Sequence, residues 1–129
     1  MSELPSAADR FGPYDERNMI RYTIFRYQSE LLTEIEWNVE SLFVTRFKAR
    51  NSPFADLREQ TRRNRFRVPD DPRIDELLAL GWPAFQDRVT DRIMAECPEK
   101  LKLNRCPACH KIVLTPQARW CMWCHHDWH

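Results

Sequence analysis

Apolar residues recur at steps of three or four along the first part of the chain, the spacing of one face of an α-helix. The series runs Ile20, Ile24, Tyr27, Leu31, Ile35, Val39 and Leu42. Asp15 is suited to cap its start, and basic residues gather near its other end. The pattern predicts one long helix of about 33 residues, roughly 50 Å in length. A helix that long needs a partner, either later helices or a second copy of the chain.

Proline and glycine mark the ends of further helical segments. A short helix is predicted from Ser52-Pro53 through Arg63. The next has Asp71 as its N-cap, Pro72 at its first position and Gly81 just past its end. The last is opened by Pro83 and stopped by Pro98. Its apolar face is formed by Phe85, Val89, Ile93 and Cys97.

These elements predict a mainly α protein with a small C-terminal module. We expect an irregular lead-in over residues 1–14, a helical domain over 15–98 and the module over 99–129. Hydrophobic residues at 43% and charged residues at 30% are typical of a globular protein rather than a disordered one. Two glycines against nine prolines favour capped helices over tight hairpins.

The first residues have neither a basic n-region nor an apolar h-region, so they do not resemble a secretory signal. No run approaches the roughly 20 apolar residues that span a bilayer. We therefore expect a cytoplasmic protein without a membrane partner. In that compartment thiols stay reduced, and clustered cysteines indicate a metal site rather than disulfides.

Residues 106–129, CPACHKIVLTPQARWCMWCHHDWH, hold four of the five cysteines and all four histidines. Two residues inside a CxxC pair let the backbone curl so that both thiolates face one ion, and a second pair completes a tetrahedral shell. The predicted ligands of one structural Zn²⁺ are Cys106, Cys109, Cys121 and Cys124. Between the pairs, a β-prone stretch at 111–114 and a turn at 115–118 predict strand, turn and strand.

The tail resembles the zinc-ribbon (zinc β-ribbon) superfamily, in which paired CPxC-type knuckles bind structural zinc. The pattern NRCPxC…TPxAxxCxxC…DWH is also similar to tails of uncharacterised bacterial proteins. The resemblance implies a small β-ribbon around one zinc ion. Many ribbons have glycine after each CxxC, whereas this chain has His110 and His125. Histidine can adopt the positive φ of such a position, at some energetic cost.

Other metal chemistries remain open at this stage. CxxCH, present twice, is also the attachment signature of c-type haem. Against haem, no export signal is visible, and two haems would share a tail of 24 residues. Iron in a rubredoxin-type tetrathiolate would use the same four ligands. Four cysteines leave no open coordination position, and the chain lacks a glycine-rich phosphate loop and G-x-S-x-G, so we expect no enzyme and no small-molecule substrate.

Charge is unevenly spread although the net charge is only +1. Residues 1–45 carry net −4 and residues 46–67 carry net +6. Arginine clusters bind phosphates, but they also neutralise acidic helices of the same chain. The tail tryptophans either stack on bases or dock the module onto the helices. Candidate residues for binding nucleic acid or a partner are Arg58, Arg62, Arg63, Arg65, Arg67, Lys111, Arg119 and Trp123.

Three functional hypotheses follow. The first is a non-enzymatic zinc protein that presents a basic, aromatic surface to nucleic acid or to a nucleic-acid-associated machine. The second is a protein–protein adaptor or homodimer that uses the long helix. The third is an electron carrier with c-type haem or an iron tetrathiolate.

Overall fold

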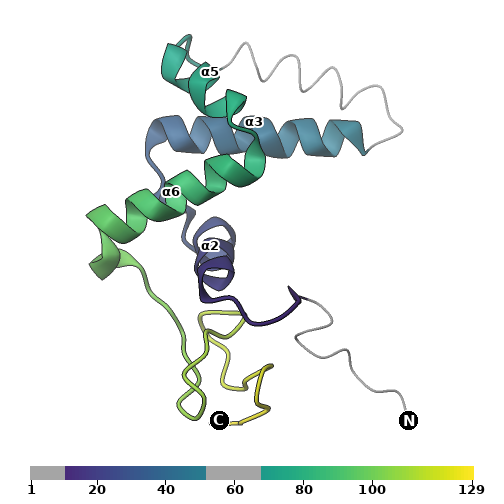
Figure 1. Cartoon of the computed structure of the whole chain (residues 1–129), viewed down its shortest axis with the longest axis vertical. Coiled ribbons are helices and arrows are strands. Elements are labelled where there is room, and N and C mark those ends of the chain that lie inside the picture. Colours follow the sequence, from purple (N-terminus) through teal and green to yellow (C-terminus); the bar gives the residue numbers. More distant parts are fainter. Residues whose placement is uncertain (1–10, 52–67) are drawn as a thin grey trace. The chain divides into compact units, whose positions relative to one another are not determined.

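The computed structural model describes residues 11–51 and 68–129, and this part of the chain is mainly helical, as predicted (Figure 1). The elements are α2 (Glu16–Tyr27), η1 (Ser29–Leu31), α3 (Glu34–Arg50), α5 (Pro72–Ala79), α6 (Trp82–Glu96) and η2 (Pro98–Lys100). None of the helices in these ranges is long and apolar enough to cross a membrane. The helix predicted from Ser52 to Arg63 lies outside the described residues.

The chain divides into two compact units. One unit is continuous and contains Leu32–Ile93, with α3, α5 and most of α6. The other joins the chain up to Leu31, which includes α2, to Met94–His129. The cysteine-rich tail therefore belongs to the same unit as the N-terminal helix, although they lie far apart in the sequence (Figure 1).

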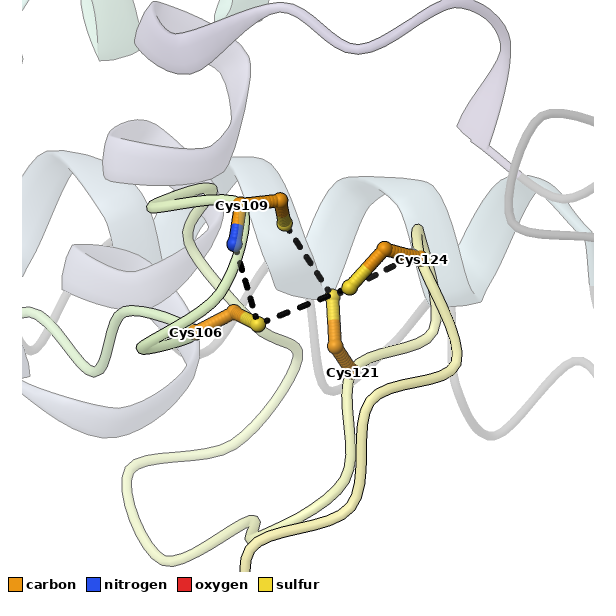
Figure 2. A group of neighbouring side chains, drawn as sticks. All are labelled: Cys106, Cys109, Cys121 and Cys124. Atoms are coloured by element: carbon orange, nitrogen blue, oxygen red, sulfur yellow. Dashed lines mark hydrogen bonds between the residues drawn. The ribbon is translucent and has the colours of Figure 1, made fainter.

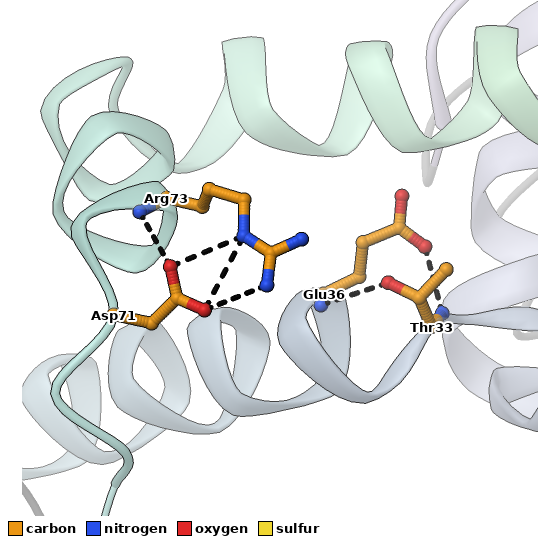
Figure 3. A network of polar contacts seen from close by, with 4 residues as sticks. All are labelled: Thr33, Glu36, Asp71 and Arg73. Carbon is orange, nitrogen blue, oxygen red and sulfur yellow. Dashed lines mark hydrogen bonds and ion pairs between the residues drawn. The ribbon is translucent and has the colours of Figure 1, made fainter.

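The prediction of a single long helix is wrong, because the chain breaks between Tyr27 and Glu34. Thr33 begins α3 with a capping box. Its hydroxyl accepts a hydrogen bond from the Glu36 N–H (3.2 Å), and the Glu36 carboxylate accepts one from the Thr33 N–H (2.8 Å; Figure 3). A capping box satisfies the free N–H groups of a helix start, so it favours a new helix here over a continuous one.

Gln28 is the residue at which α2 ends, on the N-terminal side of the break. Its side-chain carbonyl accepts a hydrogen bond from the Lys102 N–H (3.0 Å), and its side-chain amide donates to the Lys102 carbonyl. Gln28 is buried and ends α2, with its own N–H bonded to the carbonyl of Ile24. The residue is thus held by a segment 74 positions away, which no local sequence pattern reveals.

The remaining helix ends confirm the predictions. Asp15 caps α2 by accepting a hydrogen bond from the Asn18 N–H (3.0 Å). Asp71 caps α5 and also pairs with the guanidinium of Arg73, as Figure 3 shows. Gly81 follows α5 with a φ of +85°, a conformation that glycine adopts without a steric penalty.

The continuous unit has its own core. Its fully buried apolar side chains come from α3, α5 and α6, and they are Val39, Leu42, Ile74, Phe85, Val89 and Ile93. Two carboxylates lie beside this core. Glu36 receives two hydrogen bonds from the guanidinium of Arg92, at 2.8 and 2.7 Å. Glu40 receives hydrogen bonds from Trp82 Nε1 (2.9 Å) and Gln86 Nε2 (3.2 Å). Burial raises the pKa of Glu40, although both hydrogen bonds act in the opposite direction.

Candidate metal centre

The first CxxC pair lies in a turn that its own flanks close. We call residues 104–113 the first knuckle. The Cys106 N–H donates to the Lys111 carbonyl and the Val113 N–H donates to the Asn104 carbonyl, both at 2.9 Å. An isolated antiparallel bridge joins Arg105 to Ile112. These bonds fold the pair back on itself before the chain continues.

The second CxxC pair repeats this arrangement fifteen positions later, in residues 119–128, which we call the second knuckle. The Cys121 N–H donates to the His126 carbonyl (2.8 Å), and the Trp128 N–H donates to the Arg119 carbonyl (2.9 Å). A second isolated antiparallel bridge joins Trp120 to Asp127. The two halves of the tail therefore present their cysteines through the same backbone geometry.

Each knuckle turns at a histidine with a left-handed backbone. His110 has a φ of 64° and His125 a φ of 66°, at the positions where many ribbons carry glycine. Their N–H groups donate to the carbonyls of Cys106 and Cys121, both at 2.8 Å. A histidine backbone adopts this conformation at a cost that glycine avoids.

The four cysteine sulfurs converge on one point (Figure 2). Cys106 Sγ lies 3.6 Å from Cys124 Sγ, and Cys109 Sγ lies 3.6 Å from Cys121 Sγ. All four sulfurs lie within 4.8 Å of one another. A tetrahedron with metal–sulfur distances of about 2.3 Å has edges of roughly 3.8 Å. The close pairs join one knuckle to the other, so the residues fit one shared tetrahedral ion, and they form the only such cluster found among the described residues.

Backbone N–H groups in both knuckles point at sulfur. The amides of Ala108 and Cys109 donate to Cys106 Sγ at 3.3 and 3.4 Å. The amides of Trp123 and Cys124 donate to Cys121 Sγ at the same two distances. Such bonds stabilise a thiolate, which is the form that binds a metal.

The thiols differ in pKa because four of them share one small volume. At Cys106, burial raises the pKa, but the two N–H donors and hydrogen bonds with the thiols of Cys124 and Cys109 together lower the pKa to about 6. At Cys121, burial, with the thiols of Cys109 and Cys124, raises the pKa to about 12 despite equivalent donors. Neighbouring thiolates repel one another, so a cation is needed before all four ionise.

A small apolar cluster surrounds the sulfurs. The buried residues Cys106, Val113 and Cys121 form its centre. Four half-buried side chains pack against it, namely Cys109, Ala118, Trp123 and Trp128. Of the three tail tryptophans, Trp120 is the exposed one, with 41% of its surface accessible. The apolar core of the tail is small, and in small modules of this kind a bound metal supplies folding energy.

The predicted strand, turn and strand between the cysteine pairs is absent from the described tail, which contains the two isolated bridges but no named strand. The reason is that residues 111–113 pair backward with residues 104–106 of the same knuckle. The connection is instead held by Asn104, whose side-chain amide donates to the carbonyls of Thr115 (2.9 Å) and Ala118 (2.8 Å).

Tyr14 contacts the metal module and was not singled out from the sequence. Its hydroxyl accepts a hydrogen bond from the Ile112 N–H (3.0 Å), and its ring packs edge-to-face on Trp123 with centroids 5.1 Å apart. Lys111 Nζ lies 5.5 Å from the ring centroid. Burial raises the pKa of Tyr14, so the phenol stays neutral, although the Ile112 N–H acts in the opposite direction. An isolated tyrosine in an irregular segment gives no sequence signal for this role.

The predicted binding residues fall into two groups. Those from Arg58 to Arg67 lie outside the described residues. In the tail, Arg119 is exposed, while Lys111 and Trp123 are half-buried against Tyr14. The Trp123 indole also donates to the Ile112 carbonyl (3.1 Å). Trp123 is therefore a packing residue of the module rather than a free surface residue.

The fifth cysteine and the histidines lie outside the cluster of four sulfurs. Cys97 follows α6, is half-buried and is a free thiol. The ring of His126 stacks on Trp128, and the ring of His125 contacts Trp120 edge-on. His129 Nδ1 pairs with Asp127.

Comparison with protein-family models, curated proteins and solved structures found no match to this chain.

Proposed function

We propose that this chain is a non-enzymatic zinc-binding protein in which one structural Zn²⁺ folds the C-terminal module. The convergence of four cysteine sulfurs from two matching knuckles carries the proposal. Four thiolates close a tetrahedral shell and leave no position for a reacting water. Zinc bound in this way contributes its binding free energy, about 10–16 kcal/mol in comparable small sites, to folding.

The convergence of all four sulfurs favours one tetrathiolate ion over haem. In a CxxCH haem site, the two cysteines of one motif bond to the same porphyrin. Here the closest sulfur pairs, Cys106 with Cys124 and Cys109 with Cys121, join different motifs. His110 and His125 occupy turn positions in the backbone of their knuckles. Iron fits the same four sulfurs, so the choice of zinc rests on its prevalence in closed Cys₄ structural sites.

Elemental analysis of protein purified without added metal tests the proposal. We expect a colourless protein with one zinc per chain. Cys109→Ser and Cys124→Ser each remove one ligand and should lose most of the bound zinc, whereas Cys97→Ser is the matched control and should keep it. A red protein with covalently bound porphyrin, a protein with one iron per chain, or a metal-free protein with an ordered tail would overturn the assignment.

For the biological role, we propose nucleic acid or a nucleic-acid-associated assembly as the partner. The arginines of residues 58–67 support this, and so does the exposed Trp120 beside the exposed Arg119. Residues 11–31 and 94–129 hold eight bases and six acids, so Zn²⁺ with four thiolates brings that unit close to neutrality. The attraction for phosphate would therefore depend mainly on the arginine segment.

Binding to generic DNA and RNA at increasing salt tests the partner. We expect affinity to fall with salt, and to be largely lost in Arg62→Gln/Arg63→Gln/Arg65→Gln. Arg119→Gln, which removes a single charge, should weaken binding only slightly. Salt-insensitive self-association without nucleic-acid binding would favour the adaptor hypothesis instead. Because α2 and α3 are separate helices, an adaptor or homodimer would use one of them rather than a single long helix.

A further inference from the structure

Tyr14 touches both halves of the metal centre. The hydroxyl binds the Ile112 N–H of the first knuckle, and the ring packs on Trp123 of the second knuckle. Lys111, which precedes Ile112 in the first knuckle, places its ammonium group over the same ring. The two knuckles meet at the four sulfurs, in a small apolar cluster and through one hydrogen bond from the Trp123 indole to the Ile112 carbonyl. Because these direct contacts are few, we expect the surface that receives Tyr14 to be complete only when the ion is bound.

Two further links connect the α2 segment to the tail. At the N-terminal end, Glu16 forms an ion pair with Arg105, and the exposure of both side chains makes this a weak contact. At the C-terminal end, buried Gln28 exchanges two hydrogen bonds with the backbone of Lys102. The tail therefore holds α2 in its first turn and at its C-cap residue, Gln28.

The α2 helix is too short to be stable by itself. It has 12 residues, and isolated helices shorter than about 12–15 residues are marginal in water. One of its four buried residues is Thr23, whose hydroxyl donates to the Met19 carbonyl. The helix therefore depends on tertiary contacts, and its unit is completed by residues 94–129.

We propose that metal binding and the ordering of residues 14–28 are one cooperative step, with Tyr14 as the positioning residue that couples them. The inference rests on the proposed metal site and adds the N-terminal helix to what the ion folds. Metal removal releases this helix together with the tail, while the continuous unit Leu32–Ile93 stays folded on its own core. By linkage, a change that destabilises α2 must also weaken metal binding.

Amide hydrogen exchange of the full reduced chain, with and without a strong zinc chelator, tests the coupling. We expect amides in α2 to lose protection together with those of both knuckles when zinc is removed. Amides in α3 should keep theirs. Protection of α2 that survives complete zinc removal would overturn the inference while leaving the metal site intact. A chain that binds no zinc at all would overturn the proposed function itself.

Zinc affinity, measured by competition with a chromophoric chelator, tests Tyr14. Tyr14→Phe leaves the Ile112 N–H without its acceptor and should weaken zinc binding about fivefold. Tyr14→Ala also removes the ring and should weaken it about 10- to 100-fold. Tyr27→Phe removes the same hydroxyl near the other end of α2 and should leave affinity unchanged.

Linkage provides a variant that touches neither knuckle. Asp15→Ala removes the N-cap of α2 and should weaken zinc binding about fivefold, because part of the binding energy then orders a less stable helix. Equal zinc affinity in the parent, Tyr14→Ala and Asp15→Ala proteins would show that the ion and the helix fold independently.

Discussion

Two histidines occupy backbone conformations that a glycine adopts at lower cost. His110 and His125 turn the two knuckles with φ near +65°, and a side chain in the left-handed region costs roughly 1–2 kcal/mol. This strain is not isolated from the metal site, because each N–H is bonded to the carbonyl of the first cysteine in its knuckle. We therefore expect the free energy of binding the proposed ion to maintain both turns.

The cost can be measured at one position. His110→Gly should leave zinc affinity unchanged or strengthen it, whereas His110→Val, with its branched Cβ, should weaken it by about 1 kcal/mol or more. Competition with a chelator gives the affinities. His126→Gly places glycine outside a positive-φ position and should destabilise the tail by about 0.5–1 kcal/mol. If His110→Gly weakens zinc binding as much as His126→Gly does, the positive φ of His110 does not lower the zinc affinity.

Replacing a carboxylate of the continuous unit with glutamine has different expected effects on stability at Glu40 and at Glu36. Burial raises the pKa of Glu40, so the native state binds more protons than the unfolded state between pH 4.5 and the raised pKa. Stability then falls as pH rises through that window. Glu40→Gln removes the charge and should flatten this fall. Urea denaturation between pH 4 and pH 8 is the measurement, and an unchanged pH slope would contradict the expected role of Glu40.

Glu36→Gln is the contrasting variant. Its carboxylate forms a bidentate pair with Arg92, and the two side chains are 10% and 23% exposed. Removing one partner of such a pair leaves the other charge poorly compensated. Because partial exposure moderates the penalty, we expect the free energy of unfolding to fall by about 2–3 kcal/mol at pH 7. Equal stability of Glu36→Gln and the parent would show that solvent already compensates Arg92.

At the scale of elements, local sequence signals predict those helix ends that are formed by local contacts. Asp15, Asp71 and Gly81 mark helix ends in the sequence and do so in the structure. The break at residues 28–33 was missed because apolar spacing continues across it from Ile24 to Leu31. A Thr-x-x-Glu capping box at residues 33–36 was visible in the sequence, but the Gln28–Lys102 pairing was not.

The capping box itself is testable. Thr33→Ala removes the hydroxyl that accepts the Glu36 N–H and should destabilise the continuous unit by about 1 kcal/mol. Thr45→Ala, in the same helix, removes a hydroxyl that bonds back to the Ser41 carbonyl and should change stability by less than about 0.5 kcal/mol. Chemical denaturation followed by helix circular dichroism compares the two. Equal effects would show that the start of α3 does not need its cap.

For the whole molecule, the sequence predicted the four ligand candidates but not what surrounds them. CxxC spacing is a local geometric requirement, so the cluster of four sulfurs can be predicted from it. The contacts of Tyr14 with Ile112 and Trp123 join segments about a hundred residues apart, so only the folded chain reveals them. The expected β-ribbon failed for a similar reason, since backbone pairing inside each knuckle competes with pairing between them.

The order of synthesis separates the two units in time. The continuous unit ends at Ile93, whereas the other needs residues 94–129. Limited proteolysis of ribosome-arrested nascent chains should find α3 protected once residues through Ile93 have left the exit tunnel. The α2 segment should still be cleaved at that length. Protection of α2 before residues 94–129 emerge would contradict this order.

A unit assembled from two segments far apart in the sequence has a consequence for maturation in the cell. The apolar face of α2, with Met19, Ile20 and Ile24, leaves the ribosome long before the cysteines that complete its unit. Until residues 94–129 have emerged and the proposed ion is bound, we expect these side chains to be accessible to chaperones and proteases. We therefore expect zinc starvation to lower the abundance of the protein by selective turnover of newly made chains.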